Sequence, residues 1–196
     1  MNNNLTEMVF ILDCSGSMQG MESDVIGGFN SLIEKQKQLE GDAVVSTVLF
    51  SNDSTVIHDR LPLADVPAMT HRDYTACGST ALLDAIGGAV KHIQTVHRYI
   101  RKEDLPRQTI VAINTDGMEN SSRSYTYEKV KKMIVRRQED LGWQFIFMGV
   151  DMDAFATGAS LGIRPETTVR KERTRGVMYC INDEMDMMIS SMRAKK

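Results

Sequence analysis

Two continuous apolar stretches in this chain each end abruptly near an aspartate. Residues 8–12 (MVFIL) lead directly into Asp13, and residues 110–113 (IVAI) are followed closely by Asp116. An uninterrupted apolar run of this length is typical of a strand that is buried on both faces, as in a parallel sheet covered by helices. Open sheets of this type place their ligand sites at the carboxyl ends of the strands. We therefore expect Asp13 and Asp116 to face one crevice if the two strands are neighbours.

The rest of the chain alternates predicted helices with predicted strands. The helical periodicity covers about residues 21–40, 80–100, 125–138, 154–161 and 174–192, and the further strands cover 44–50, 55–61, 143–150 and 167–169. Because the first two of these strands closely flank Ser51-Asn52-Asp53, they read as a hairpin at a sheet edge. The fold class expected is α/β: a Rossmann-like, doubly wound three-layer sandwich with a mostly parallel central sheet, one antiparallel edge strand and helices on both faces.

Length and composition favour one domain over residues 1–196. The chain has a net charge of −3 and is 42% hydrophobic, which suits one core but not two ordinary domains. Its three cysteines, with no CxxC motif, favour a reducing compartment over a disulfide framework. No stretch resembles a signal peptide or reaches the length of a membrane span. We expect a cytoplasmic protein that does not enter a membrane.

Short oxygen-bearing side chains gather after the two apolar stretches. DCSGSM supplies Asp13, Ser15 and Ser17, TDG supplies Asp116, and GST supplies Thr80 at the start of a predicted helix. Each residue taken alone could simply cap a helix or end a turn. Together they form a set of hard oxygen donors with no competing cluster of Cys and His, which favours Mg²⁺, with Mn²⁺ or Ca²⁺ as alternatives, over Zn²⁺.

These motifs resemble the von Willebrand factor A domain. The pattern D-x-S-x-S after a strand, a Thr opening a later helix and T-D-G after another strand match its metal-ion-dependent adhesion site (MIDAS) at Asp13, Ser15, Ser17, Thr80 and Asp116. The stretches GGFNSLIEKQK, VSTVLFSND, GSTALLDAI and NTDGMENSS are similar to the bacterial branch of the family. The resemblance implies that the hydroxyls bind the cation directly, that the Asp pair acts directly or through water, and that a Glu or Asp carboxylate of a protein partner completes the coordination shell.

Several other acidic side chains lie near the predicted site. Asp84, one turn into the predicted helix, is expected to support the site rather than bind the cation, and Glu119 and Asn120 are expected to cap a turn. Asp151 and Asp153 follow another predicted strand and could line the same crevice, although aspartate often only marks a turn. No catalytic residue is assigned.

The predicted last helix has a methionine-rich face. Its apolar positions follow spacings of three and four and comprise Met178, Ile181, Met185, Met188 and Met192. We expect this face to cover the sheet, and self-association through it, as a homodimer, is the alternative because methionine surfaces repack easily. Two basic stretches, HRYIRKEDLPR and EKVKKMIVRRQ, are interpreted as solvated helix faces rather than a nucleic-acid surface, since the whole chain is mildly acidic.

A metal-dependent protein-binding module is the function favoured by these observations. The serious alternative is a metal-dependent hydrolase acting on a phosphoester or a peptide, because a bound cation can polarise an oxygen or activate water. Such an enzyme would also need a placed general base, and the sequence offers none beyond the predicted Asp ligands. We therefore expect no enzymatic activity and no cofactor other than the cation.

Overall fold

The computed structural model describes the backbone of residues 2–150, 153–171 and 177–194, and the side chains of residues 4–150, 153–170 and 183–194. Its centre is a six-stranded sheet in the order β3-β2-β1-β4-β5-β6. The strands are β1 (Asn2–Asp13), β2 (Ala43–Phe50), β3 (Ser54–Pro62), β4 (Pro106–Thr115), β5 (Gln144–Val150) and β6 (Thr168–Lys171). Only the β2–β3 pair is antiparallel, so β3 forms the predicted antiparallel edge.

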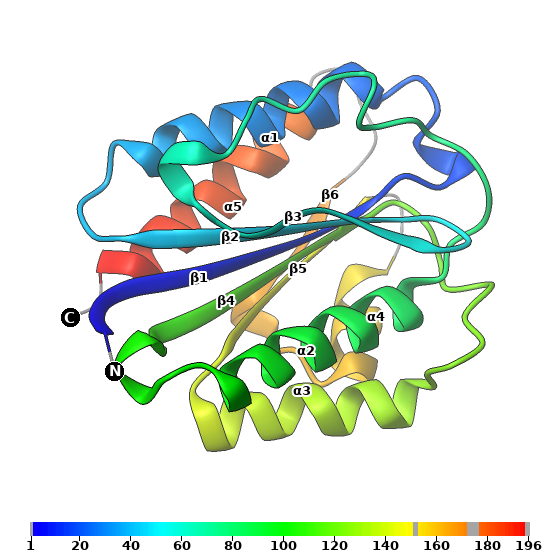
Figure 1. Ribbon diagram of the computed structural model, residues 1–196. Coiled ribbons are helices and arrows are strands. Elements are labelled where there is room, and N and C mark those ends of the chain that lie inside the picture. Colours follow the sequence, from blue (N-terminus) through cyan, green and yellow to red (C-terminus); the bar gives the residue numbers. More distant parts are fainter. Residues whose placement is uncertain (1, 151–152, 172–176, 195–196) are drawn as a thin grey trace.

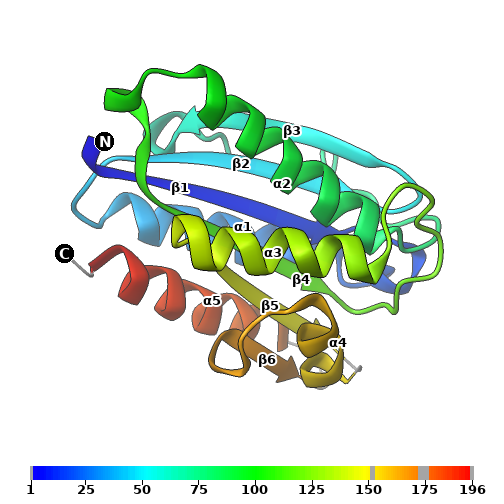
Figure 2. The ribbon, with the colours of Figure 1, turned by 90° about the horizontal axis from the view of Figure 1, so that it is seen from below.

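Helices cover both faces of this sheet (Figures 1 and 2). On one face lie α1 (Glu22–Lys37) and α5 (Val177–Ala194), and on the other lie α2 (Leu82–Tyr99), α3 (Tyr127–Leu141) and α4 (Ala154–Leu161). Short 3₁₀ turns occur at Gly16–Met18, Leu63–Asp65, Lys102–Asp104 and Pro165–Thr167. The predicted fold class is confirmed, and the element boundaries mostly agree with the sequence periodicity to within a few residues.

Strand β1 shows why the apolar run had to be continuous. Met8, Phe10 and Leu12 pack into the core beneath α1 and α5, whereas Val9 and Ile11 pack into the core beneath α2 and α3. Both faces of the strand are buried over residues 8–12, which are all apolar, and the buried Glu7 just before them is paired with Arg60 and His97. The neighbouring β4 is parallel to β1, with Leu12 opposite Asn114. The ends of both apolar runs therefore meet at one edge of the sheet.

The last helix lies with its methionine face inward, as predicted, over the part that is described. Met185 and Met192 are buried in the core and Met188 packs against it. Met178 and Ile181 lie outside the residues whose side chains are described. Arg193 is also buried, and its guanidinium donates hydrogen bonds to the backbone carbonyls of Gln36 and Gly41. The end of α5 is thus fastened to the end of α1.

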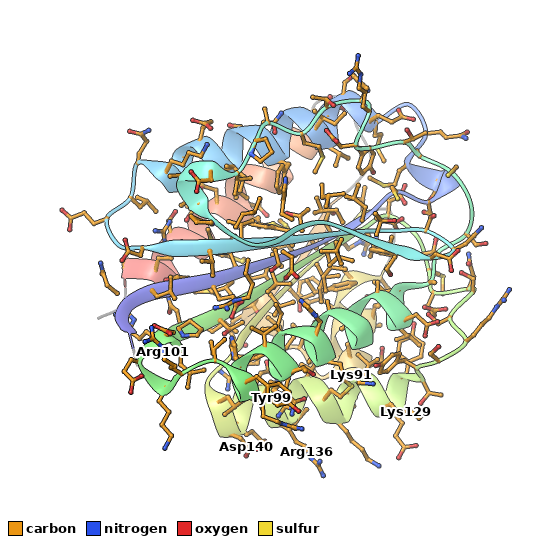
Figure 3. All side chains as sticks on the ribbon, in the orientation of Figure 1. Lys91, Tyr99, Arg101, Lys129, Arg136 and Asp140 are labelled. Atoms are coloured by element: carbon orange, nitrogen blue, oxygen red, sulfur yellow. The ribbon has the colours of Figure 1, made fainter. Side chains whose placement is uncertain are left out.

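Several side chains of the two basic stretches face outward. Figure 3 shows Lys129 and Arg136 on the side of α3 that points away from the sheet, and both are exposed. Arg101 is exposed beyond the end of α2, where it pairs with Asp104. These positions fit the solvated helix faces expected from the sequence. Within the described residues, no helix combines the length and the apolar character needed to cross a bilayer.

Candidate metal centre

Asp13 lies buried at the carboxyl end of β1, with both carboxylate oxygens held by the protein. One oxygen accepts a hydrogen bond from the backbone N–H of Ser15 (2.7 Å), and the other accepts one from the hydroxyl of Thr115 (2.5 Å). The backbone carbonyl of Asp13 accepts a further hydrogen bond from the hydroxyl of Tyr74. The carboxylate is therefore fixed in position by the end of β4 and by the loop that follows β1.

The two serines and Asp116 form a continuous chain of contacts in front of Asp13. The hydroxyls of Ser15 and Ser17 lie 2.9 Å apart, and the Ser17 hydroxyl donates to the Asp116 carboxylate at 2.5 Å. Ser15 is almost completely buried, whereas Ser17 is exposed. The loops after β1 and β4 thus bring their oxygen atoms together as the two apolar runs predicted, with the exposed side at Ser17.

Thr80 reaches the same place from a third loop. A Cβ built on Gly117 would lie 2.8 Å from the Thr80 hydroxyl and 3.4 Å from the Ser17 hydroxyl. Both hydroxyls therefore lie next to Gly117, on the side where another residue would carry its side chain. The structure therefore brings together all five predicted residues: Asp13, Ser15, Ser17, Thr80 and Asp116. This donor set consists of carboxylates and hydroxyls, which fits a hard divalent cation.

Burial and a neighbouring negative charge both favour a cation beside the Asp13 carboxylate. Burial raises the pKa of Asp13, the hydrogen bonds from Thr115 and Ser15 oppose that rise, and the nearby Asp116 adds to it. Two carboxylates that interact unfavourably in a buried crevice are stabilised when a positive charge lies between them. The arrangement therefore has the electrostatics expected of a cation site as well as the donor atoms.

The helix α2 begins later than the sequence predicted. The helix begins at Leu82, not at Thr80, because the Thr80 backbone exchanges hydrogen bonds with Asn120 and the N–H of Ala81 donates to Ser51. The helix N-terminus is also not open to an outside anion. The Glu119 carboxylate accepts a hydrogen bond from the N–H of Leu83, and so occupies that position itself.

Glu119 and Asp84 bind the loop after β4 to the start of α2. Glu119 accepts hydrogen bonds from the backbone N–H groups of Ser121 and Ser122 as well as from α2. Asp84 accepts hydrogen bonds from the backbone N–H groups of three successive residues, Arg123, Ser124 and Tyr125. Asp84 thus supports the loop, as predicted, while Glu119 does more than cap a turn.

Thr115 is the important site residue that the sequence reasoning missed. Its hydroxyl holds Asp13 and also accepts a hydrogen bond from the N–H of Gly117. The only signal for it was its position inside the TDG motif, next to Asp116. Asn52 was missed as well, and its side chain accepts hydrogen bonds from the backbone and the hydroxyl of Ser79 in the loop before Thr80.

The other candidates lie apart from these contacts. Asp153 caps α4 by accepting a hydrogen bond from the N–H of Ala156, whereas Asp151 lies outside the described residues. His92 pairs with Asp59, and His97 pairs with the buried Glu7. The described residues contain no group of three or more His, Cys, Asp and Glu side chains placed to hold a metal. Any site for a cation there depends on hydroxyl oxygens.

Comparison by sequence finds no match, either among models of known protein families or among curated proteins. Comparison with solved structures finds clear similarity. Proximal thread matrix protein 1 from the mussel byssus, in a structure with a zinc-occupied MIDAS motif, matches 96% of this chain at 16% identity and a TM-score of 0.67. The match covers 46% of the mussel structure, so this chain spans about half of that protein's length.

Two bacterial structures give the same result. A von Willebrand factor type A protein from Catenulispora acidiphila matches 94% of this chain at 15% identity and a TM-score of 0.59, over 42% of its own length. The von Willebrand factor domain of the type V pili tip protein Mfa5 from Porphyromonas gingivalis matches 99% of this chain and 98% of its own, at 11% identity and a TM-score of 0.67. The fold of this chain is therefore of the von Willebrand factor A type.

Proposed function

We propose that this chain, a protein of von Willebrand factor A-type fold, is a Mg²⁺-dependent module that captures an acidic group of a protein partner. The observation that carries the proposal is the chain of contacts from Ser15 through Ser17 to Asp116, with Thr80 beside Gly117 and Asp13 fixed behind. The zinc in the MIDAS motif of the mussel structure supports a divalent cation in general. The choice of Mg²⁺ rests on the oxygen-only donor set, with Mn²⁺ and Ca²⁺ as alternatives.

The roles of the residues follow from their surroundings. Ser15, Ser17 and Thr80 would bind the cation through neutral hydroxyl oxygens, and Asp116 would contribute next to Ser17. Asp13 already receives hydrogen bonds at both of its oxygens, so it would act mainly on the hydroxyls and waters around the cation. When bound, the ion would supply a positive charge that the neutral hydroxyl ligands balance only in part.

A partner's carboxylate is the ligand that such a centre would favour. The exposed side of the site at Ser17 is where this group would enter. Met118, which directly follows the glycine of the loop, is 75% exposed and offers an apolar contact beside the entrance. A large exposed side chain of this kind is a suitable anchor for a protein surface. The partner we propose therefore presents a Glu or Asp side chain with an apolar neighbour, and the encounter takes place in the cytoplasm.

The hydrolase alternative lacks a positioned base among the described residues. Each of the four histidines contacts another residue: His58 contacts Thr47, His71 contacts Ser23, His92 contacts Asp59 and His97 contacts Glu7. None of these contacts involves the five-residue set. The acids closest to the site, Asp84 and Glu119, are held by backbone N–H groups. A turnover screen on phosphoesters and peptides with Mg²⁺ or Mn²⁺ tests this alternative. Metal-dependent turnover that Asp13→Ala abolishes would favour the enzyme over the binding module.

Two measurements test the proposed function. Isothermal titration with Mg²⁺ and Mn²⁺ is expected to give one site per chain in the wild type and none in Asp13→Ala or Ser17→Ala. Asp153→Ala, which alters only the cap of α4, is the matched control and should bind like the wild type. Capture of protein partners on the immobilised chain should then depend on Mg²⁺, be lost in EDTA and be lost in Asp13→Ala. Capture that persists in EDTA would contradict the proposal.

A further inference from the structure

Two cysteines lie opposite each other on the loops that carry the predicted metal ligands. Cys14 stands between Asp13 and Ser15, and Cys77 lies three residues before Thr80. The N–H of Cys77 donates a hydrogen bond to the carbonyl of Cys14 at 2.8 Å, and the N–H of Gly16 donates one to the carbonyl of Gly78 at 2.9 Å. The loop after β1 and the segment that leads into α2 therefore run in direct backbone contact, at the end of the sheet where Figure 1 shows both.

This hydrogen bond limits the distance between the two Cα atoms. A carbonyl oxygen lies about 2.4 Å from its own Cα and an amide nitrogen about 1.5 Å from its own, by standard backbone geometry. With 2.8 Å between oxygen and nitrogen, the two Cα atoms are at most about 6.7 Å apart. Disulfides in proteins span Cα separations of about 4.4–6.8 Å. The backbones of Cys14 and Cys77 are thus already within the range of a disulfide.

The side chains and their surroundings allow the bond to form. The Cys77 thiol is close enough to contribute to the raised pKa of Cys14, after burial and the Asp13 carboxylate. The hydrogen bond that the Cys14 thiol donates to the carbonyl of Phe50, at 3.3 Å, is a weak one. Residues 66–81, all of which the structure describes, form neither helix nor strand, and Cys77 is exposed, so its side chain can turn without disturbing a helix or strand. Both cysteines are reduced in this structure.

We propose that Cys14 and Cys77 are a reversible disulfide-modification site that controls the metal loops. The co-substrate is a small disulfide such as oxidised glutathione. Cys77 is exposed and Cys14 is partly buried, so the reagent meets Cys77 first. The Cys77 sulfur, as thiolate, attacks the small disulfide and releases one glutathione thiol. The Cys14 thiol, once it has lost its proton, then attacks the Cys77 sulfur and releases the second; because burial disfavours this thiolate, the second step is the slower one. Two protein thiols are oxidised, one small disulfide is reduced to two thiols, and both protons pass to them.

The consequence for the cation rests on the function proposed above. The new bond would fasten the loop that carries Ser15 and Ser17 to the segment that ends at Thr80, in the arrangement that the two backbone hydrogen bonds already define. Ligands that are held in place lose less freedom when they bind an ion. The oxidised protein is therefore expected to bind Mn²⁺, used as the probe, at least about threefold more tightly than the reduced protein.

The test treats the full chain with oxidised glutathione and maps the products by mass spectrometry. In a Cys180→Ser background, which removes the third cysteine, we expect a Cys14–Cys77 linkage that dithiothreitol reverses. Cys14→Ser should stop at a mixed disulfide of Cys77 with glutathione, and Cys77→Ser should form no internal disulfide. The melting temperature should rise by about 5 °C or more on oxidation, because the bond closes a long loop of the unfolded chain. A chain that carries only glutathionylated Cys77, even on long incubation, would overturn the inference.

Titration of both forms with Mn²⁺ separates this inference from the proposed function. Tighter binding by the oxidised form supports both. If the reduced protein binds the ion and the oxidised form binds it equally well, control of the metal loops is contradicted; weaker binding by the oxidised form contradicts the predicted pre-arrangement of the ligands. If the disulfide forms and neither form binds Mn²⁺, the proposed function fails, and so does any control of a metal site, while the disulfide itself remains as a measured modification.

Discussion

The contact between Thr115 and Asp13 is the residue-scale feature on which the site depends most. The Asp13 carboxylate is held in one orientation by the Thr115 hydroxyl from the neighbouring strand together with the Ser15 N–H. We predict that Thr115→Val, which keeps the shape and removes the hydroxyl, weakens Mn²⁺ binding by about 10- to 100-fold. Isothermal titration measures this effect. Thr95→Val, whose hydroxyl contacts only its own helix at Lys91, is the matched control, and equal losses in both variants would contradict the assigned role.

Gly117 is the second residue whose identity matters. Its hydrogen faces the Thr80 hydroxyl so closely that a methyl group would lie 2.8 Å from it. We predict that Gly117→Ala displaces the Thr80 hydroxyl and reduces Mn²⁺ affinity by about tenfold or more. Gly88→Ala is the control, because a Cβ at that helical position meets nothing within 4 Å. The control should bind Mn²⁺ normally and be slightly more stable, since alanine favours helix. Normal binding by Gly117→Ala would show that Thr80 does not take part.

Cys14 packs against the core and also contacts a residue far away in the sequence. Burial, together with the nearby Asp13 carboxylate, raises the pKa of the Cys14 thiol to about 11. The Cys14 side chain packs against the core, which is the ordinary role of a partly buried thiol. Its backbone contact with Cys77 joins residues 63 positions apart in the chain. No local pattern could indicate that contact.

At the scale of elements, the loop after β4 and the start of α2 form one unit. Asp84 accepts three backbone hydrogen bonds from this loop. Partial burial acts to raise the pKa of Asp84, but these N–H donors outweigh it and the net pKa is lowered below the usual 3.8. A carboxyl with a lowered folded-state pKa stabilises the fold above its unfolded pKa, and this contribution is lost as the pH falls through the folded pKa.

We therefore predict a pH-dependent stability difference between the wild type and Asp84→Asn. The variant should be less stable at pH 7, and the difference should shrink as the pH falls below about 3.8. Urea unfolding at a series of pH values measures it. Asp153→Asn, in which the replaced side chain can still cap α4, is the control and should show a smaller difference at pH 7. A difference that stays constant down to acid pH would contradict the role of the charge.

The boundaries of the elements show what a local pattern can and cannot reveal. The run in β1 predicted a doubly buried strand because each of its side chains had to be apolar, and Met8 and Val9 indeed lie in opposite cores. The start of α2 was placed two residues too early. The reason is long-range: Asn120 holds the backbone of Thr80, and Glu119 fills the helix N-terminus. Residues about 40 positions away decided where the helix begins.

At the scale of the molecule, a mostly parallel sheet with one antiparallel edge could be inferred from the sequence, but the strand order and the supporting contacts could not. Asp13 and Asp116 meet because β1 and β4 are parallel neighbours, which was the condition attached to the expectation of a shared crevice. No sequence pattern, in contrast, predicted that Arg193 is buried, since a charged residue near the end of a helix is normally exposed. It is buried because the carbonyls at the end of α1 need hydrogen-bond donors.

A cation bound only to the folded chain must stabilise the whole molecule. At a free Mg²⁺ concentration of about 100 times the dissociation constant, the gain is about 2.7 kcal/mol. For a chain of this size that corresponds to a rise in melting temperature of about 5–10 °C. Differential scanning calorimetry should show this rise in the wild type, its reversal by EDTA, and its absence in Asp116→Ala. The same rise in melting temperature in Asp116→Ala would mean that the ion binds elsewhere on the protein.

The central claim is that the protein-bound ion keeps a position open to a carboxylate. Nuclear relaxation of acetate protons in the presence of Mn²⁺ and the protein measures it directly, because only a ligand next to the paramagnetic ion relaxes quickly. Acetate should relax much faster with the wild-type protein than with Ser17→Ala at equal total Mn²⁺, after correction for unbound ion, and neutral acetamide should show little effect. If protein-bound Mn²⁺ relaxes acetate no more than acetamide, the site does not capture carboxylates.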